Sequence, residues 1–482
     1  YDVAGRTIES IDPLDQVSTT VYDAASRTIA SVNPLGERTT TVYDVAGRTI
    51  ESIDPLAQVN TTVYDAASRT IASVNPLGER TTTVYDVAGR TIESIDPLDQ
   101  VSTTVYDAAS RTIASVNKVG GRTTTVYDVA GRAIELIDPL DRTSTTVYDA
   151  AGRTIASISP LGYITTTVYD PAGRTIEVTG PLNYTTTSLY DAASRQIATV
   201  DAEAHRSTSV YDAAGRMIAS VDAEDRRTTT VYDAASRRVR LLNARDKTTT
   251  YSYDAAGQLG QETDPLGRIT TTTYDAAGRM ASRTDPRGDR VTMTYDAAGQ
   301  LGLEHFSDGT RLTYTYDPAG RRTRMEDPTG ITSITYTARG EVRSTTSPAD
   351  KTVTYTYGPT GRRLGMMDSV EGRYTYVHDP VGNLRYLFNP QSDRTTFTYD
   401  ADNRLTRKQL ASGTDVTHIY NEAAWLAELR NLESDGTEIQ VMTYTYDRVG
   451  NRTRALALDG AVTTWTYYKN YQLKREEETG GT

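Results

Sequence analysis

The chain has 482 residues, a net charge of −12 and no cysteine, and hydrophobic residues make up 37% of it. The acidic balance excludes the basic stripe with which nucleic-acid-binding proteins contact phosphates, and the lack of cysteine excludes disulfides and thiolate metal sites. No run approaches the roughly 18 apolar residues of a membrane span. Tyrosine occurs 33 times, against 3 phenylalanines and 2 tryptophans. This composition can cover a sheet but cannot fill a thick core.

Tyrosine followed by aspartate recurs every 21 residues, from Tyr1 through Tyr22 and Tyr43 to Tyr316. Residues 1–42 and 43–84 differ at only two positions, so two 21-residue forms alternate in a 42-residue unit. Periodicity of this kind predicts a repeat array in which each unit is stabilised by its neighbours. Because the first residue is already the tyrosine of a repeat, we expect a segment of a longer polypeptide.

Each repeat contains two strand-like runs and two turns. Residues 38–43 and 48–53 are rich in Thr, Val, Ile and Tyr, which favour strands. In the repeat that begins at Tyr43, the structural turn positions are Tyr43, Asp44, Gly47, Arg48, Asp54 and Pro55. We expect the aspartates to cap the turns, the proline to fix φ, and the glycine to supply a positive φ. Serine replaces this glycine in alternate repeats, as at Ser26, which predicts a slightly different or strained turn.

The alternation of strands and turns predicts an all-β fold of tandem antiparallel β-hairpins. The competing architecture is a parallel solenoid, but it would stack like charges roughly 4.8 Å apart along its whole length. Ile50 and Ile53 are three residues apart, which does not fit a strict strand. A β-bulge or a strand covered on both faces reconciles them, and the run is too short for a helix. Some 46 strands then form one long sheet, and its twist must coil it into a hollow shell or a fibre-like spiral.

The regularity of the repeats divides the chain into three regions. Residues 1–316 hold regular repeats, residues 317–420 degenerate ones, and residues 421–482 divergent hairpins and a tail. A 26-residue interval separates Tyr420 from Tyr446 and contains the turn residues 434–436. It predicts a longer hairpin, with a short helix over residues 422–430 as the alternative. The charged tail over residues 474–482 is expected to be frayed.

The complete motif of residues 274–279, Tyr-Asp-Ala-Ala-Gly-Arg, preceded by Asp-Pro-Leu-Gly-Arg at 264–268, resembles the RHS/YD-repeat family. The resemblance covers nearly the whole chain in some twenty copies. It implies a long β-sheet that spirals into a hollow shell, in a secreted or cell-surface protein. Toxin-bearing members are similar to one another in a core domain with an autoproteolytic aspartate motif, followed by a variable toxic domain. Neither is present in residues 1–482.

No residue pattern indicates catalysis, a cofactor or a metal site. Asp44 and Arg48 are interpreted as a turn cap and a locally paired cation, because a catalytic site would not be copied without a specialised copy. Gln258 and Gln300 replace the arginine in two repeats, so its charge is expected to be dispensable. The four histidines, including His205 and His418, show no metal-ligand spacing.

Two features are compatible with sugars. The repeated tyrosines could bind glycans, although cross-strand packing with a solvated hydroxyl is the favoured interpretation. Asn60, Asn183 and Asn451 each begin a triplet that fits the N-glycosylation pattern.

The sequence therefore predicts a non-enzymatic, extracellular structural protein that builds a β-sheet scaffold, fibre or shell. Its expected partners are copies of itself or the rest of its own longer chain, with glycans as a further candidate and no nucleic acid. The alternatives are a hollow cocoon around a C-terminal toxin and a glycan-binding surface adhesin.

Overall fold

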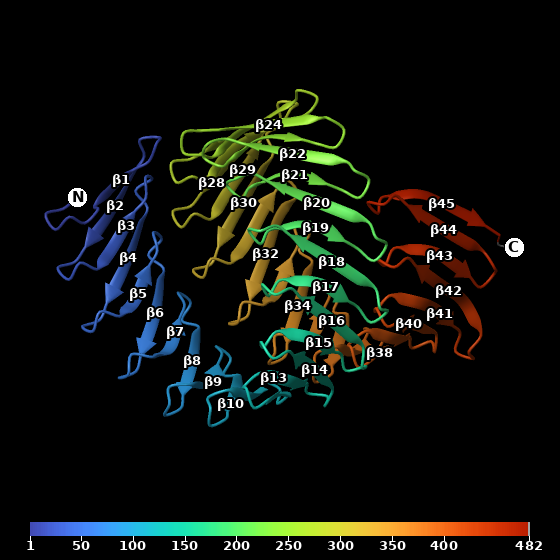
Figure 1. Cartoon of the computed structure of the whole chain (residues 1–482). Helices are drawn as coiled ribbons and strands as arrows, with labels where there is room; N and C mark the ends of the chain where they lie inside the picture. Colours follow the sequence, from blue (N-terminus) through green and yellow to red (C-terminus); the bar gives the residue numbers. More distant parts are fainter. Residues whose placement is uncertain (481–482) are drawn as a thin grey trace. The chain divides into compact units, whose positions relative to one another are not determined.

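The computed structural model describes residues 1–480, and within them the chain forms 45 strands and no helix (Figure 1). All 45 strands belong to one sheet, and strands that follow each other in the chain pair antiparallel. For example, β4 (Arg38–Tyr43) lies between β3 (Thr28–Val32) and β5 (Thr49–Ile53). This confirms the antiparallel hairpin array and excludes the parallel solenoid.

The other strands of the first half are β1 (Glu9–Ile11), β2 (Val17–Tyr22), β6 (Val59–Tyr64), β7 (Thr70–Val74), β8 (Arg80–Tyr85), β9 (Thr91–Ile95), β10 (Val101–Tyr106), β11 (Thr112–Val116), β12 (Arg122–Tyr127), β13 (Ala133–Ile137), β14 (Thr143–Tyr148), β15 (Thr154–Ile158), β16 (Ile164–Tyr169), β17 (Thr175–Thr179), β18 (Thr185–Tyr190), β19 (Gln196–Val200), β20 (Arg206–Tyr211), β21 (Met217–Val221), β22 (Arg227–Tyr232) and β23 (Arg238–Leu242). Those of the second half are β24 (Thr248–Tyr253), β25 (Leu259–Thr263), β26 (Ile269–Tyr274), β27 (Met280–Thr284), β28 (Arg290–Tyr295), β29 (Leu301–Phe306), β30 (Arg311–Tyr316), β31 (Arg322–Asp327), β32 (Gly330–Tyr336), β33 (Val342–Thr346), β34 (Thr352–Tyr357), β35 (Arg363–Met367), β36 (Arg373–His378), β37 (Leu384–Phe388), β38 (Arg394–Tyr399), β39 (Leu405–Gln409), β40 (Asp415–Tyr420), β41 (Leu426–Leu432), β42 (Glu438–Tyr446), β43 (Arg452–Ala457), β44 (Val462–Tyr467) and β45 (Leu473–Thr479).

The chain divides into two compact units, each built from segments distant in sequence. Unit 1 contains Tyr1–Thr104, Tyr232–Arg240 and Thr248–Glu371. Unit 2 contains Val105–Val231, Leu241–Lys247 and Gly372–Thr482. Within each unit the sheet therefore returns to lie beside itself, as expected for a coiled sheet. We refer below to the earlier and later segments of each unit.

A β-bulge interrupts the regular pairing in the hairpins whose first strand ends at the repeat tyrosine. Val42 pairs with Glu51, whereas the next residue, Tyr43, pairs with Thr49, so Ile50 is the extra residue. The same register shift recurs in the following repeats, for example between Val63 and Tyr64. The bulge explains the three-residue spacing of the isoleucines and confirms that the run is a strand.

Two kinds of turn join the strands, and we number the five residues of each turn from 1 to 5. The Tyr-Asp turn follows the repeat tyrosine, as in residues 44–48. The Asp-Pro turn lies at the opposite end of the strands, as in residues 54–58. In both turns the Oδ1 of the residue at position 1 accepts hydrogen bonds from two backbone N–H groups. Asp44 accepts from Ala46 and Arg48, at 2.9 Å each. Asp54 accepts from Leu56 at 2.9 Å and from Gln58 at 2.8 Å.

Position 4 of the Tyr-Asp turn is left-handed whichever residue occupies it. Gly47 has a φ of 82° and Ser26 a φ of 62°. The glycine therefore has its expected role, and the serine turn keeps the same conformation. A non-glycine residue in this region stores some strain, which the surrounding hydrogen bonds must offset.

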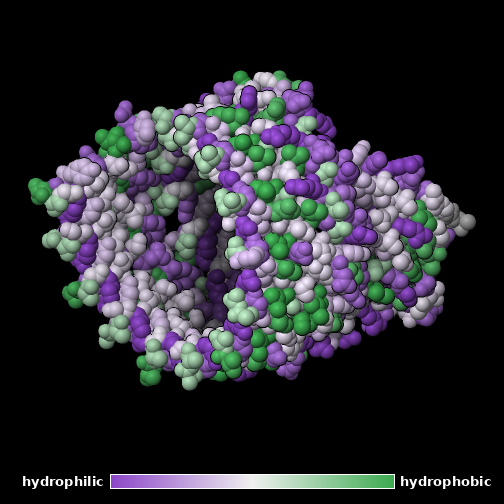
Figure 2. Space-filling model, viewed as in Figure 1, coloured by the Kyte–Doolittle hydropathy of each residue, from purple (hydrophilic) through white to green (hydrophobic). Residues whose placement is uncertain are grey.

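Small residues form the most buried positions of the sheet. Ala30, Ala72 and Ala114, which are equivalent in successive 42-residue units, are each 1% exposed. Among the described residues no large side chain is fully buried. On the face shown in Figure 2, hydrophobic residues are interspersed with hydrophilic ones instead of forming one continuous patch. This agrees with a thin sheet whose stability is distributed from neighbour to neighbour.

The divergent C-terminal part remains β-structure. Residues 426–432 form β41, which pairs with β42 across a long hairpin, so the helix considered for residues 422–430 is absent. The expected fraying of the tail is wrong up to Thr479, because β45 pairs with β44 over seven residues. Residues 481–482 lie outside the described part of the chain. No helix long and apolar enough to cross a membrane occurs in residues 1–480.

Replacing Ala72 by leucine is expected to destabilise the surrounding strands by about 1–3 kcal/mol, because the added atoms have no space between β6 and β8. Hydrogen–deuterium exchange should show faster exchange in those strands and little change beyond the neighbouring repeats. The matched control is Val87→Ala in an exposed turn, where the side chain is 108% exposed. Equal effects of the two variants would contradict a tightly packed alanine row.

Candidate functional site: the arginine ladder and the seams

Each arginine at position 5 of a Tyr-Asp turn connects two successive repeats. The Nε of Arg48 donates to Asp44 Oδ2 at 2.7 Å, and its Nη2 lies 2.6 Å from the same oxygen. The guanidinium carbon lies 4.7 Å from the centre of the Tyr64 ring, and Nη1 donates to the carbonyl of Asp65 at 3.0 Å. One side chain thus combines an ion pair, a cation–π contact and a backbone hydrogen bond. We call the row of these side chains the arginine ladder.

The repeat tyrosine is fixed at both ends of its ring. Tyr43 Oη donates to the carbonyl of Thr28 at 2.9 Å, while the guanidinium of Arg27 covers the ring at 4.7 Å. The same pair of contacts recurs at Tyr64 with Thr49 and Arg48. The tyrosines therefore pack across the strands as expected, and their hydroxyl also donates to a backbone carbonyl. Where the ladder arginine is present, it covers one face of the ring.

The glycine and serine forms of the turn serve the ladder differently. Arg48 Nη1 donates to Ser68 Oγ at 3.1 Å, so a serine at position 4 provides an additional acceptor for the preceding arginine. In the alternate repeat, a Cβ on Gly47 would lie 3.5 Å from Arg27 Nη1. The serine hydrogen bond is a compensation for the strained φ of the serine turns.

Several aspartates that pair with ladder arginines have a lowered pKa. The backbone N–H of Arg48 and then its side chain lower the pKa of Asp44 below the ordinary aspartate value. The same causes lower the pKa of Asp23, Asp86 and Asp128. The charged carboxylate is thus the form that the folded turn prefers.

The other predicted positions lie apart from one another. Asn60 is exposed on β6, and Asn183 is exposed in an Asp-Pro turn with a φ of 59°. Asn451 occupies position 5 of a Tyr-Asp turn, where its Nδ2 donates to Asp447 Oδ2 at 2.8 Å. Among the described residues no group of three potential metal ligands gathers at one point.

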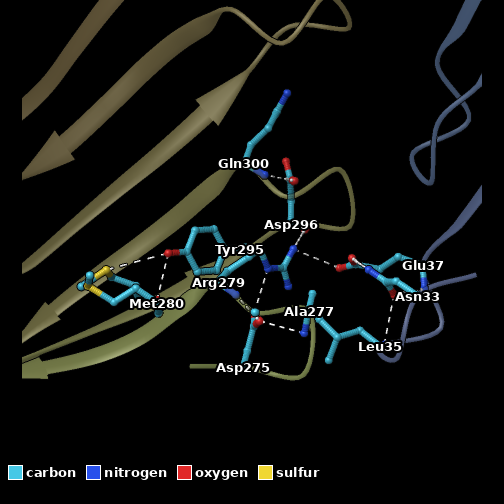
Figure 3. A network of polar contacts seen from close by, with 12 residues as sticks. Asn33, Leu35, Glu37, Asp275, Ala277, Arg279, Met280, Tyr295, Asp296 and Gln300 are labelled. Atoms are coloured by element: carbon cyan, nitrogen blue, oxygen red, sulfur yellow. Dashed lines mark hydrogen bonds and ion pairs between the residues drawn. The ribbon is translucent and has the colours of Figure 1, made fainter. Parts of the chain in front are cut away.

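A second set of contacts joins the two segments of each unit. In unit 1, Arg279 Nη1 lies 3.4 Å from Glu37 Oε1, and Arg321 Nη1 lies 3.6 Å from Glu79 Oε1. The arginines belong to Tyr-Asp turns of the later segment and the glutamates to Asp-Pro turns of the earlier one. Figure 3 shows the Arg279 guanidinium between its own Asp275, the carbonyl of Asp296 and Glu37. We call this row of turn-to-turn contacts the seam.

Position 5 matches position 5 along the seam of unit 1. Glu37 and Glu79 each lie opposite the arginine 242 residues later. At the same separation, Gln16 lies opposite Gln258 and Gln58 opposite Gln300. Gln16 and Gln258 line a common cavity of about 340 Å³. The two repeats that carry glutamine in place of the ladder arginine thus face a neutral residue, so this exchange is matched across the seam.

An irregular turn keeps the seam intact where the motif is lost. Residues 337–341 replace the usual aspartate and arginine with Thr337 and Glu341. Arg339, at position 3, instead reaches Asp96 Oδ2 at 3.3 Å and the carbonyl of Gly358 at 2.7 Å. The side chains of Arg339 and Asp96 are each only 10% exposed. The degenerate repeat thus keeps the contact across the seam but makes it with an arginine at a different position of the turn.

Unit 2 has its own seam, with different chemistry at position 5. Arg404 lies over the Tyr163 ring at 5.5 Å, and Trp425 stacks on Tyr184 with ring centres 6.2 Å apart. Arg226 Nη1 donates to Gln472 Oε1 at 3.2 Å. Sequence reasoning found none of the seams, because their partners are about 240 residues apart. One signal in the sequence could have indicated the seam of unit 1. Position 5 alternates between Gln and Glu in the first repeats, and between Gln and Arg, with Gln258 and Gln300, in the repeats 242 residues later.

Acid is expected to destabilise the ladder. Because the folded-state pKa of Asp23, Asp44, Asp86 and Asp128 is lowered, the contribution of these carboxylates is complete above the unfolded aspartate pKa and is lost as the pH falls through the folded value. The thermal midpoint should stay level from pH 7 to 5 and fall below about pH 4. Circular dichroism against temperature at several pH values measures it. Asp44→Asn keeps the capping oxygen without the charge, so the protection of that single turn, relative to the intrinsic exchange rate at each pH, should no longer fall in acid. A midpoint that rises in acid would contradict this account.

A charge reversal tests the seam of unit 1. Glu37→Arg should speed amide exchange in the turns at residues 33–37 and 275–279, because two guanidinium groups then face each other. In a double-mutant cycle, E37R and R279E should show a coupling free energy of roughly 0.5–3 kcal/mol. Protection should recover at residues 33–37 but not at 275–279, because R279E also removes the pairing with Asp275. As a control, E37Q/R279Q recreates the natural Gln16–Gln258 combination and should leave the seam closed. Additive effects of the two single reversals would show that the residues do not interact.

Comparisons with known proteins agree with this geometry. A family model described as RHS Repeat matches residues 169–206, 211–248, 238–269, 253–290, 274–305 and 295–332. No curated protein matches the sequence. The crystal structure of TcdB2-TccC3-TEV is similar over 95% of this chain with a TM-score of 0.78 and 16% identity, and that of TcdB2-TccC3 over 95% with a TM-score of 0.77 and 16% identity. This chain covers 33% and 31% of those chains, or about a third of their length. The family model thus identifies RHS repeats within residues 169–332, and the similar structures share the fold of the Tyr-Asp hairpin array.

Proposed function

We propose that this chain is a non-enzymatic structural wall: a segment of a β-sheet shell that encloses another part of its own longer polypeptide. The observation that carries the proposal is the seam, in which Glu37–Arg279 and Glu79–Arg321 join the two segments of one unit in a fixed register. A sheet that is joined to itself edge to edge forms a continuous barrier.

The chemistry of the turns supports a structural role. Asp44 and Arg48, the most reactive-looking pair of the repeat, satisfy each other and the backbone. The charged groups of the ladder therefore act as internal fasteners. Similar contacts recur along the array, and each adds a small increment to the stability of its neighbours.

The surroundings proposed for this wall are extracellular or at the cell surface. The family resemblance supports this setting, and Asn60 and Asn183 are exposed, as glycosylation acceptors must be. The similar structures contain about three times the length of this chain, which supports the rest of a longer polypeptide as its main partner. The enclosed material is then a polypeptide segment, with a C-terminal toxin as the specific candidate.

Imaging of the native polypeptide tests the shell. Negative-stain electron microscopy should show closed particles of uniform size, and an enclosed segment should resist added protease until the wall is opened. The reversal of both seam glutamates, E37R/E79R, should increase protease access without changing the length of the particles. The variant E37Q/E79Q, which removes the same two carboxylates without placing like charges opposite each other, is the matched control. Long uniform threads would favour a fibre and reject the shell.

A further inference from the structure

One stretch of the unit 2 seam departs from the repeat pattern at several positions together. Position 1 of the Asp-Pro turn is Asp or Asn in every repeat from Asp12 to Asp285, except for Ser159 and Gly180. In these same two turns position 5 is a tyrosine, Tyr163 or Tyr184. On the other side of the seam, Trp425 replaces the ladder arginine, and it is one of only two tryptophans in the chain. Specialised copies within a uniform array indicate a specific local task.

The departures surround a cavity of about 920 Å³ within unit 2. This volume lies near the upper end of the roughly 300–1,000 Å³ of small-molecule sites. Tyr163, Tyr184 and Trp425 line it, together with hydroxyl-bearing residues of β14 and β15 such as Thr146 and Ser157. The cavity therefore combines aromatic walls with a polar floor.

The aromatic wall has uncovered surface. The rings of Tyr184 and Trp425 are nearly parallel, at 23°, with their centres 6.2 Å apart. Both side chains are half-buried, so part of each is exposed. The Trp425 ring also contacts the Tyr446 ring, with centres 5.3 Å apart, where Arg48 in its own repeat lies over Tyr64.

Two charged groups at the cavity have no partner side chain within residues 1–480. They are the carboxylate of Glu422 and the guanidinium of Arg448, and both residues are exposed. By contrast, Asp402 is engaged, because it accepts the Ser159 hydroxyl at 3.1 Å and so replaces the missing turn cap. Glu422 and Arg448 offset each other, and Arg404 is paired with Asp400, so the Asp402 carboxylate leaves the lining with one excess negative charge that disfavours anionic ligands.

We propose that this cavity, the Tyr184–Trp425 site, binds a neutral oligosaccharide. The C–H face of a sugar ring packs on the open aromatic surface, while Glu422 accepts hydrogen bonds from sugar hydroxyls and Arg448 donates to them. The excess carboxylate at Asp402 disfavours phosphate or another anion, which would call for an excess of arginine and lysine. This binding role is additional to the proposed shell and does not depend on it.

Tryptophan fluorescence measures the binding directly. In a Trp465→Phe background Trp425 is the only tryptophan, so its emission reports on the site. The intact chain is titrated with neutral oligosaccharides from gluco-, galacto- and chito-series, with inorganic phosphate, and with the peptide Gly-Trp-Gly. We expect a saturable emission change with at least one neutral oligosaccharide and none with phosphate.

The repeat array itself supplies a variant that keeps the fold. Tyr184→Gln places at position 5 the residue found at Gln16 and Gln58, and should weaken oligosaccharide binding about tenfold or more. His205→Gln changes the same position in the next repeat, outside the cavity, and should leave binding unchanged. Circular dichroism confirms that both variants are folded. Silence across the oligosaccharide panel, unchanged affinity in Tyr184→Gln, or a response only to Gly-Trp-Gly would overturn the proposal.

Discussion

The bridge made by each ladder arginine is the interaction on which the rest of this structure depends. A thin sheet without large buried side chains cannot rely on a packed core. Arg48 substitutes for one by holding its own turn through Asp44 and the next repeat through Tyr64 and Asp65. Individually such surface contacts contribute little, but their regular repetition makes them collectively important. The Tyr-Asp motif therefore marks the residues that hold one repeat to the next.

Much of the local fold could be predicted from the sequence because it depends on near neighbours. The capping by Asp44, the left-handed Gly47 and the bulge needed by Ile50 follow from the residues themselves. The hydroxyl partner of Tyr43 could not be predicted, because it lies 15 residues back and its position depends on the strand register. The contact between Glu37 and Arg279 is further from reach, because it depends on twist accumulated over many strands.

The residues of the candidate sites differ in how far the sequence alone identifies them. Tyr163, Tyr184 and Trp425 break the consensus of their repeats, so a comparison of each copy with its siblings identifies them as exceptions. Nothing in that comparison shows that they meet, because Tyr184 and Trp425 lie in different segments of unit 2. Conversely, loss of the repeat motif does not always mean loss of the contact. In the irregular turn, Arg339 at position 3 makes the seam contact that the position-5 arginine makes elsewhere.

The match of position 5 across the seam has a consequence for how such a chain can grow. Along the earlier segment Gln16, Glu37, Gln58 and Glu79 alternate with a period of two repeats, and their partners alternate with them. Inserting a 42-residue unit restores the same sequence of pairs after the insertion. Inserting a single 21-residue repeat would set glutamine against arginine and glutamate against glutamine. Duplication in pairs, which the near-identity of residues 1–42 and 43–84 records, is the mode of lengthening that this seam tolerates.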